Sequence, residues 1–286
     1  MLVTVARHEP DTDKVAQVIE VLAGILAEEL AEEPLTAWDL HGAVGTALTL
    51  ARKRGLLDPE AEEIDTWNAY VGAMQASSAV FAAVVAEGPV ECLLGRRGVR
   101  EIPAVGPQYF TDAGSWVDAF WLSVICREPQ RLDLLSTVPI SVLRDSGAQF
   151  DEYIYAWAGA LQAYRRKAPE LMELLLAAIE GTDPDVARVA DREVLLKLLY
   201  PPIAALNQLV QRDGEKFNAA LARGLELHRE YWTADEDRVE DSNGFVSLPL
   251  LAIACLAHDS GLPVEVQSDY LPKHLLLRSW VGEYDT

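Results

Sequence analysis

The apolar residues of this 286-residue chain recur at three- and four-residue steps along most of its length, the spacing of one helix face. Near the N-terminus, Val15, Ile19, Leu22 and Leu26 would line a single helix in this way. Runs of β-branched residues between the helical segments, which a parallel α/β fold needs, are absent. We therefore predict an all-α fold of about eleven helices, the clearest over residues 15–30, 36–55, 58–85, 116–125, 150–164, 171–180, 186–200, 203–211, 217–231 and 248–257.

The loops between these predicted helices are short, so consecutive helices should run antiparallel. We expect a single all-helical domain over residues 1–286, packed as antiparallel hairpins in a solenoid-like array or a compact bundle. Prolines are expected at helix boundaries, with Pro201-Pro202 separating two helices. Val264-Glu265-Val266 alternates like one short strand, too little to build a sheet.

The helical periodicity fails over residues 88–110. Glycines and prolines there predict an irregular insert with one short extended piece at most. Arg96, Arg97 and Arg100 make the insert the densest positive cluster of the chain. These arginines would bind an anion or the acidic edge of a partner, or pair internally with the surplus carboxylates, and the excess of acid favours internal pairing.

The charge balance is strongly acidic, with 45 Asp and Glu against 24 Lys and Arg, a formal net charge of -21 and a pI near 4.5. Such a field repels polyanions, so nucleic acid is not expected as a direct partner. It attracts cations and basic proteins, and clustered carboxylates raise the rate at which such a partner is encountered.

Cysteine usage and hydropathy favour the cytoplasm. Cys92, Cys126 and Cys255 form an odd set without CxxC spacing, which predicts neither a disulfide framework nor a zinc knuckle. Residues 1–10 lack the apolar core of a secretory signal. Residues 66–86 carry no charge and are long enough to span a membrane, but their polar residues and many alanines favour a helix buried among other helices. No membrane association is predicted.

Motifs for nucleotide binding or hydrolysis are absent, since the sequence has no GxxxxGK[ST], strand-anchored GxGxxG, GxSxG or HExxH. The favoured interpretation therefore has no catalytic residue, no cofactor and no metal. One alternative rests on His258-Asp259, because metal-dependent phosphohydrolases of the HD type use such a pair, and His228 and Asp269 could complete the site. The pair also fits an ordinary helix C-terminus, where histidine complements the helix dipole.

Five carboxylates follow Trp232 within ten residues. Their number would suffice for a magnesium site of the prenyl-diphosphate type, but Ser242-Asn243-Gly244 and the residues before the run are turn formers, which favours a solvated loop. Tryptophan is enriched where binding energy concentrates, and Trp280 is a second such candidate. The candidate partner-binding residues are Trp232, Asp235, Glu236, Asp237, Glu240 and Asp241.

A more specific pattern begins at the same place. Tyr231-Trp-Thr-Ala-Asp-Glu-Asp-Arg238 is followed by Gly244-Phe245, Leu250-Leu-Ala-Ile-Ala-Cys-Leu-Ala-His-Asp259, Val264-Glu-Val266 and Tyr270-Leu-Pro-Lys-His274. This succession resembles the immunity protein 49 family of bacterial polymorphic-toxin systems, most strongly over residues 231–276. Trp38-Asp-Leu-His41 and the helix content are compatible with the same family.

The resemblance implies a mostly α-helical cytoplasmic protein, encoded beside a cognate toxin, that binds and neutralises the toxin without turning over a substrate. It transfers no functional residue. Toxin domains that cut nucleic acids tend to be basic because they hold phosphates, so a charge of -21 suits a protein that occupies the same groove. Two alternatives stay open: an HD-like metal-dependent phosphohydrolase, and a helical scaffold that binds another protein outside any toxin system. No oligomeric state is predicted.

Overall fold

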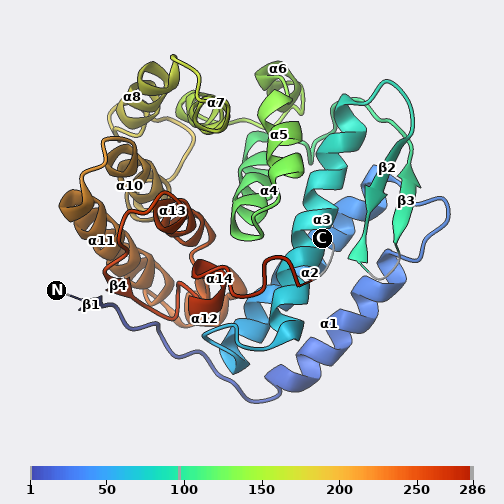
Figure 1. Ribbon diagram of the computed structural model, residues 1–286, viewed down its shortest axis with the longest axis horizontal. Coiled ribbons are helices and arrows are strands. Elements are labelled where there is room, and N and C mark those ends of the chain that lie inside the picture. The colour runs from blue at the N-terminus through green and yellow to red at the C-terminus, as the bar shows by residue number, and fades with distance from the viewer. Residues whose placement is uncertain (1, 96–97, 284–286) are drawn as a thin grey trace. The chain divides into compact units, whose positions relative to one another are not determined.

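The computed structural model describes residues 2–95 and 98–283 of the chain (Figure 1). Helices make up 62% of it and the strands are very short, which confirms the predicted all-α class. The chain divides into two compact units: unit 1 comprises Met1–Asp11 and Gln149–Ser279, and unit 2 comprises Thr12–Ala148 and Trp280–Thr286. That the whole chain forms a single domain stays a prediction.

Unit 2 is organised around one long helix, α3 (Ile64–Val85), which packs against α2, α4 and α5 and is buried along almost its whole length. By length and composition α3 could cross a membrane, but 83% of its most hydrophobic window is buried inside the structure, as in a core helix. The other elements of unit 2 are α1 (Val15–Glu29), α2 (Ala37–Leu57), β2 (Val90–Leu93), β3 (Val99–Ile102), α4 (Ala113–Ile125), α5 (Pro129–Thr137) and α6 (Ile140–Arg144).

The start of α2 is fixed by a capping box. The Thr36 side chain accepts a hydrogen bond from the Asp39 backbone N–H, and the Asp39 carboxylate accepts one from the Thr36 N–H at 2.8 Å. The sequence predicted this start, but the helix continues past Gly55, the expected stop, to Leu57. The next helix begins at Ile64 and not at the predicted Asp58, because the Asp58 carboxylate accepts the N–H groups of residues 62 and 63 in a turn.

The segment predicted as an irregular insert contains a β-hairpin. Strands β2 and β3 pair antiparallel, with Val90 opposite Ile102 and Leu93 opposite Val99, so the segment has two extended pieces where at most one was expected. Alternation of buried and exposed residues is too short here to be recognised in the sequence. Arg100 pairs internally with a carboxylate, as favoured, its Nη2 lying 3.7 Å from Glu33 Oε1, and it also donates to the Leu30 carbonyl at 3.0 Å. Arg96 and Arg97 lie outside the described residues.

Unit 1 consists of paired helices and a two-stranded sheet to which the N-terminal segment contributes one strand. Strand β1 (Val3–Thr4) lies parallel to β4 (Val266–Gln267), so the predicted short strand near 264–266 finds its partner at the start of the chain. Consecutive helices pack together, α7 with α8 and α10 with α11. The helices are α7 (Tyr153–Arg166), α8 (Leu171–Gly181), α9 (Arg192–Val194), a π-helical turn (Leu195–Leu199), α10 (Tyr200–Val210), α11 (Gly214–Trp232), α12 (Glu236–Glu240), a 3-10 turn (Ser242–Gly244), α13 (Leu248–Asp259) and α14 (Lys273–Leu276).

Pro201-Pro202 does not separate two helices, so that prediction was wrong. The helical residues run without a break from Arg192 to Val210. A proline within a helix lacks its N–H and its ring crowds the preceding turn. The wider π-helical turn at Leu195–Leu199 comes directly before the two prolines and gives the preceding turn the extra room that the rings need.

The helix predicted to begin at Val186 begins at Arg192. Backbone N–H groups of residues 188–190 all donate to the Asp151 carboxylate, which keeps this stretch in a loop. Asp191 then caps the helix with its own carboxylate. A carboxylate contributed from 37 to 39 residues away has therefore overridden the local helical spacing.

Candidate functional site

The carboxylates of Asp235–Asp241, hereafter the acidic segment, lie on α12 and on the two residues that cap its ends. The segment was expected to be a solvated loop, but its middle forms this short helix. Asp235 accepts a hydrogen bond from the Arg238 N–H at 2.8 Å, and Asp241 accepts from the Asn243 N–H at 2.8 Å. Glu240 accepts from the Asp11 N–H at 2.9 Å. Three of the five carboxylates thus accept hydrogen bonds from backbone N–H groups, two of them within the same segment or directly after it.

Glu236 and Asp237 are the two carboxylates of the acidic segment that point to solvent without such a role. Both are exposed and lie in the first turn of α12. Within residues 2–95 and 98–283 neither makes a hydrogen bond or an ion pair. Their charge is therefore available to a partner without breaking an internal contact.

Trp232 has a packing role beside the acidic segment. Its indole covers Gly244 so closely that a Cβ at that position would lie 2.8 Å from the ring atom Cγ. The ring also contacts Tyr231 edge-on, with centroids 4.9 Å apart. Trp232 is half-buried, so part of the ring remains accessible beside the carboxylates.

A network of ion pairs attaches the acidic segment to the helix that begins at Arg192. Glu193 accepts from Lys197 and from Arg238, both at 3.0 Å, and these two hydrogen bonds hold the pKa of Glu193 below its ordinary value. The Arg238 guanidinium also lies 4.2 Å from the centroid of the Tyr231 ring. Because Arg238 and Lys197 are engaged in these contacts, the charge that the acidic segment presents outward is negative.

The residues of the HD-type alternative are used in other ways. His258 and Asp259 contact each other, Nδ1 to Oδ1 at 3.2 Å, at the C-terminal end of α13. His228 is buried, with Nε2 3.0 Å from the Gly244 carbonyl oxygen. Among the described residues, no group of three metal-ligating side chains includes His228, His258, Asp269 or a carboxylate of the acidic segment.

A partly exposed aromatic cluster in unit 2, with Phe110 buried beneath it, was missed by the sequence analysis. It consists of Trp38, His41, Tyr109 and Phe110, and we call it the aromatic cluster. Trp38 and Tyr109 are 50% and 59% exposed, unusually high values for such large rings. His41 stacks on Phe110 with centroids 4.6 Å apart, and Trp38 meets Phe110 edge-on at 4.9 Å. Surface-exposed Trp and Tyr are typical of protein interfaces.

The second tryptophan proposed from the sequence, Trp280, is engaged inside unit 2. Its Nε1 donates a hydrogen bond to the Ala61 carbonyl at 2.9 Å, and the residue is half-buried. Of the tryptophans considered for binding, Trp38 therefore offers the most accessible ring. A tryptophan in a regular helical pattern gives no sign in the sequence of whether another helix covers it.

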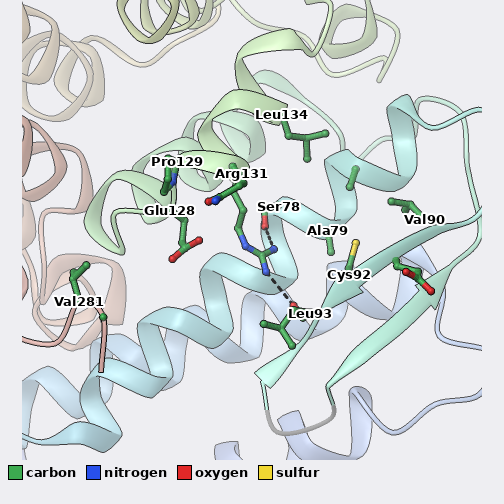
Figure 2. A pocket seen from close by; sticks show the side chains of 14 residues that line it. Ser78, Ala79, Val90, Cys92, Leu93, Glu128, Pro129, Arg131, Leu134 and Val281 are labelled. Atoms are coloured by element: carbon green, nitrogen blue, oxygen red, sulfur yellow. Dashed lines mark hydrogen bonds between the residues drawn. The ribbon is translucent and has the colours of Figure 1, made fainter. Parts of the chain in front are cut away.

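A groove of about 640 Å³ lies between α3, β2 and the start of α5 (Figure 2). Its guanidinium, Arg131, donates to Ser78 Oγ at 2.7 Å and to the Leu93 carbonyl at 3.1 Å, both drawn as dashed lines in Figure 2. Burial raises the pKa of the Cys92 thiol in the same groove, which keeps the sulfur in its unreactive protonated form. Arg131 therefore serves the fold by joining α3, α5 and the hairpin.

Comparison with known protein families gives a match. A profile of the family described as immunity protein 49 matches residues 58–275, a span that includes the acidic segment, Tyr109 and Phe110. Neither the curated proteins nor the solved structures include a match to this chain. Since the matched span covers most of the sequence and agrees with the resemblance seen at residues 231–276, the chain belongs to the immunity protein 49 family.

Proposed function

We propose that this protein neutralises a toxin by binding it directly in the cytoplasm, without turning over a substrate. The family match over residues 58–275 carries the proposal, because the description of the family is that of an immunity protein. The absence of catalytic motifs from the sequence agrees with a binding role. The toxin is the partner that the family implies in general, and its chemistry is argued from the charges below.

The proposed partner is a basic toxin domain. A net charge of -21 produces a field that attracts a cationic protein and speeds its encounter. Toxins that act on nucleic acids carry such cationic surfaces because they hold phosphates. Immunity would then result from occupation of that surface by carboxylates.

The acidic segment is our proposed steering element. Glu236 and Asp237 are exposed and make no internal hydrogen bond or ion pair among the described residues, so they meet a partner at no cost to the fold. Asp235, Glu240 and Asp241 shape the segment through their backbone contacts, and the exposed part of Trp232 adds apolar contact area. Charges at such a rim chiefly raise the association rate constant.

Co-expression tests the neutralising role. Cells that produce the toxin should survive when this protein is present and die when it is absent, and the two proteins should elute together in gel filtration. The proposal is wrong if the toxin kills equally in both cases and no complex survives gel filtration. A stable complex with a protein that is not toxic would support the helical-scaffold alternative instead.

A charge-neutralising pair tests the steering role. The variant Glu236→Gln/Asp237→Asn should lower the association rate constant several-fold at low salt and change the dissociation rate constant little. The control Glu20→Gln/Glu173→Gln removes two exposed carboxylates elsewhere, with the same change in net charge. The difference between variant and control should shrink at high salt. Equal association rate constants for the two would remove the acidic segment from the proposed interface.

A further inference from the structure

A small pocket in unit 2 lies beside the aromatic cluster, between α2, α3 and α4. Its volume is about 190 Å³. Pockets for metabolites and drug-sized ligands are typically ~300–1,000 Å³, so this one suits a single side chain better than a free small molecule. It is lined by His41, Val44, Gly45, Leu48, Ser77, Val80, Phe81, Phe110, Ser115 and Asp118.

The pocket contains a carboxylate without a hydrogen-bond partner. Asp118 makes no hydrogen bond or ion pair with any described residue, although it lies on a helix that is otherwise almost wholly buried. It keeps a small accessible surface, yet it is deep enough that burial raises the pKa of its carboxyl group. The positive charge of Arg52 opposes that rise, but Arg52 does not line the pocket. A carboxylate in such a place favours a cationic ligand.

The hydroxyl groups of the pocket present acceptors and not donors. The Ser77 hydroxyl donates its hydrogen bond to the Met74 carbonyl at 3.1 Å, and the Ser115 hydroxyl donates its hydrogen bond to the Asp112 carboxylate at 3.2 Å. Their lone pairs remain to accept hydrogen bonds. Burial lowers the pKa of His41, so at neutral pH its imidazole adds no positive charge. The lining thus combines one carboxylate with neutral groups.

One wall of the pocket is aromatic, and it continues to the surface. Phe110 and His41 line it as a parallel pair, with planes inclined by 10°. Trp38 and Tyr109 contact Phe110 and are themselves exposed. Flat aromatic faces attract guanidinium groups by cation–π interaction and stacking.

We propose that this pocket binds the side chain of an arginine presented by the toxin, with Asp118 as its counter-ion and Phe110 as its stacking face. Arginine fits better than lysine because its planar group carries five N–H donors, which the acceptors of Asp118, Ser77 and Ser115 can share. Trp38 and Tyr109 would cover the entrance once the partner is bound. The identity of the partner rests on the proposed function, whereas the chemistry of the pocket does not.

The pocket is tested on the full chain with a small probe. N-acetyl-L-arginine methylamide, titrated by NMR, should shift the amide signals of Gly45, Ser77 and Ser115, and the neutral citrulline analogue should not. Asp118→Asn should lower the affinity for the arginine probe at least tenfold, whereas Glu20→Gln should leave that affinity unchanged. Equal shifts with arginine and citrulline, or unchanged affinity in Asp118→Asn, would overturn the proposal.

A second variant keeps the test decisive if Asp118→Asn does not fold. Gly45 lies on α2 at the pocket with no neighbouring atom within 4 Å of an added Cβ, so Gly45→Leu should block the entrance without a change of charge. Gly24→Leu on α1, also without a close neighbour, is the control. We expect loss of probe binding in the first variant and none in the second. Retained binding in a folded Gly45→Leu protein would contradict the assigned position.

The toxin complex separates this inference from the proposed function. If the wild-type protein binds the toxin, Asp118→Asn should raise the dissociation constant at least tenfold. Binding of wild type and Asp118→Asn with equal affinity would overturn the arginine pocket and leave the immunity role intact. If the wild-type protein binds no toxin, the immunity role fails, and the probe titration still decides the chemistry of the pocket.

Discussion

At the scale of single residues, the contacts and burial of His8 favour the neutral form of its imidazole. Its Nδ1 lies 2.8 Å from the Tyr270 hydroxyl and its Nε2 lies 3.2 Å from the Val239 carbonyl oxygen. The backbone N–H of His8 donates to the same hydroxyl at 3.1 Å. These contacts fit a neutral ring that donates through Nε2 and accepts through Nδ1. Burial lowers the pKa of His8, in agreement with that tautomer.

A pH dependence of stability follows. Between its lowered pKa and the ordinary value of about 6.5, His8 is neutral in the folded chain and protonated in the unfolded chain. Unfolding then takes up a proton, so the free energy of unfolding falls as the pH drops below about 6.5. Urea unfolding at about pH 7.5 and about pH 5.5 should show a smaller loss for His8→Gln than for wild type. A loss of the same size in both proteins would contradict the neutral assignment.

The residue scale is also where sequence reasoning was weakest. The helical pattern around Trp38 predicted a helix, and the structure confirms it, but the pattern does not say which face another element covers. Trp38 is 50% exposed, whereas Trp280, the binding candidate named from the sequence, is half-buried and donates a hydrogen bond to the Ala61 carbonyl. In the sequence, Asp118 is one polar residue within an apolar helical pattern. Its lack of a hydrogen-bond partner could not be predicted, because it depends on how α2, α3 and α4 pack around it.

At the scale of elements, helix pairs depend on close backbone approach. Gly181, the last residue of α8, lies so near α7 that an added Cβ would come within 2.6 Å of Tyr153 Cβ and 3.2 Å of its Cα. Gly181→Ala should therefore lower the free energy of unfolding by about 1–3 kcal/mol, because backbone must shift. Gly24→Ala, with open space on α1, should raise it by about 0.5–1 kcal/mol. Urea denaturation of both variants measures the difference, and equal effects would refute the close contact.

Arg131 provides part of the attachment of the β2–β3 hairpin to the helices. Arg131 on α5 donates to Ser78 on α3 and to the Leu93 carbonyl on β2 (Figure 2). Arg131→Met leaves that carbonyl without this donor and should cost about 1.5–3 kcal/mol of stability, the range for hydrogen bonds to charged groups. Arg188→Met removes an exposed guanidinium bonded to the adjacent Ala187 carbonyl and should cost much less. Thermal unfolding that does not distinguish the two would argue against this attachment.

Local chemistry predicted the elements better than their boundaries. The starts of α2, α8 and α13 were predicted correctly from the sequence. The errors have physical causes outside the local pattern: Asp151 holds residues 188–190 in a loop from a distance, and a π-helical turn accommodates Pro201-Pro202. The hairpin was hidden because strands of four residues leave too little alternation to recognise.

At the scale of the whole molecule, the charge of -21 and the family match are the two observations that support neutralisation of a basic toxin by binding. Composition predicted an acidic chain without direct nucleic-acid binding, and the segment at residues 231–276 pointed to the family that the profile confirms. The acidic segment stays a prediction for partner contact, with Glu236 and Asp237 as its accessible charges. The aromatic cluster and its pocket could not be foreseen, because they join α2 to residues about 70 positions away.

Stoichiometry is the most direct test of neutralisation by binding. A fixed amount of purified toxin is titrated with this protein and the residual toxin activity is measured after equilibration. We predict a linear fall that ends at a fixed molar ratio, does not deepen with longer incubation, and is reversed when the complex is separated under denaturing conditions and the toxin refolded. Progressive inactivation by a small fraction of an equivalent, with a covalently changed toxin or product, would contradict the account.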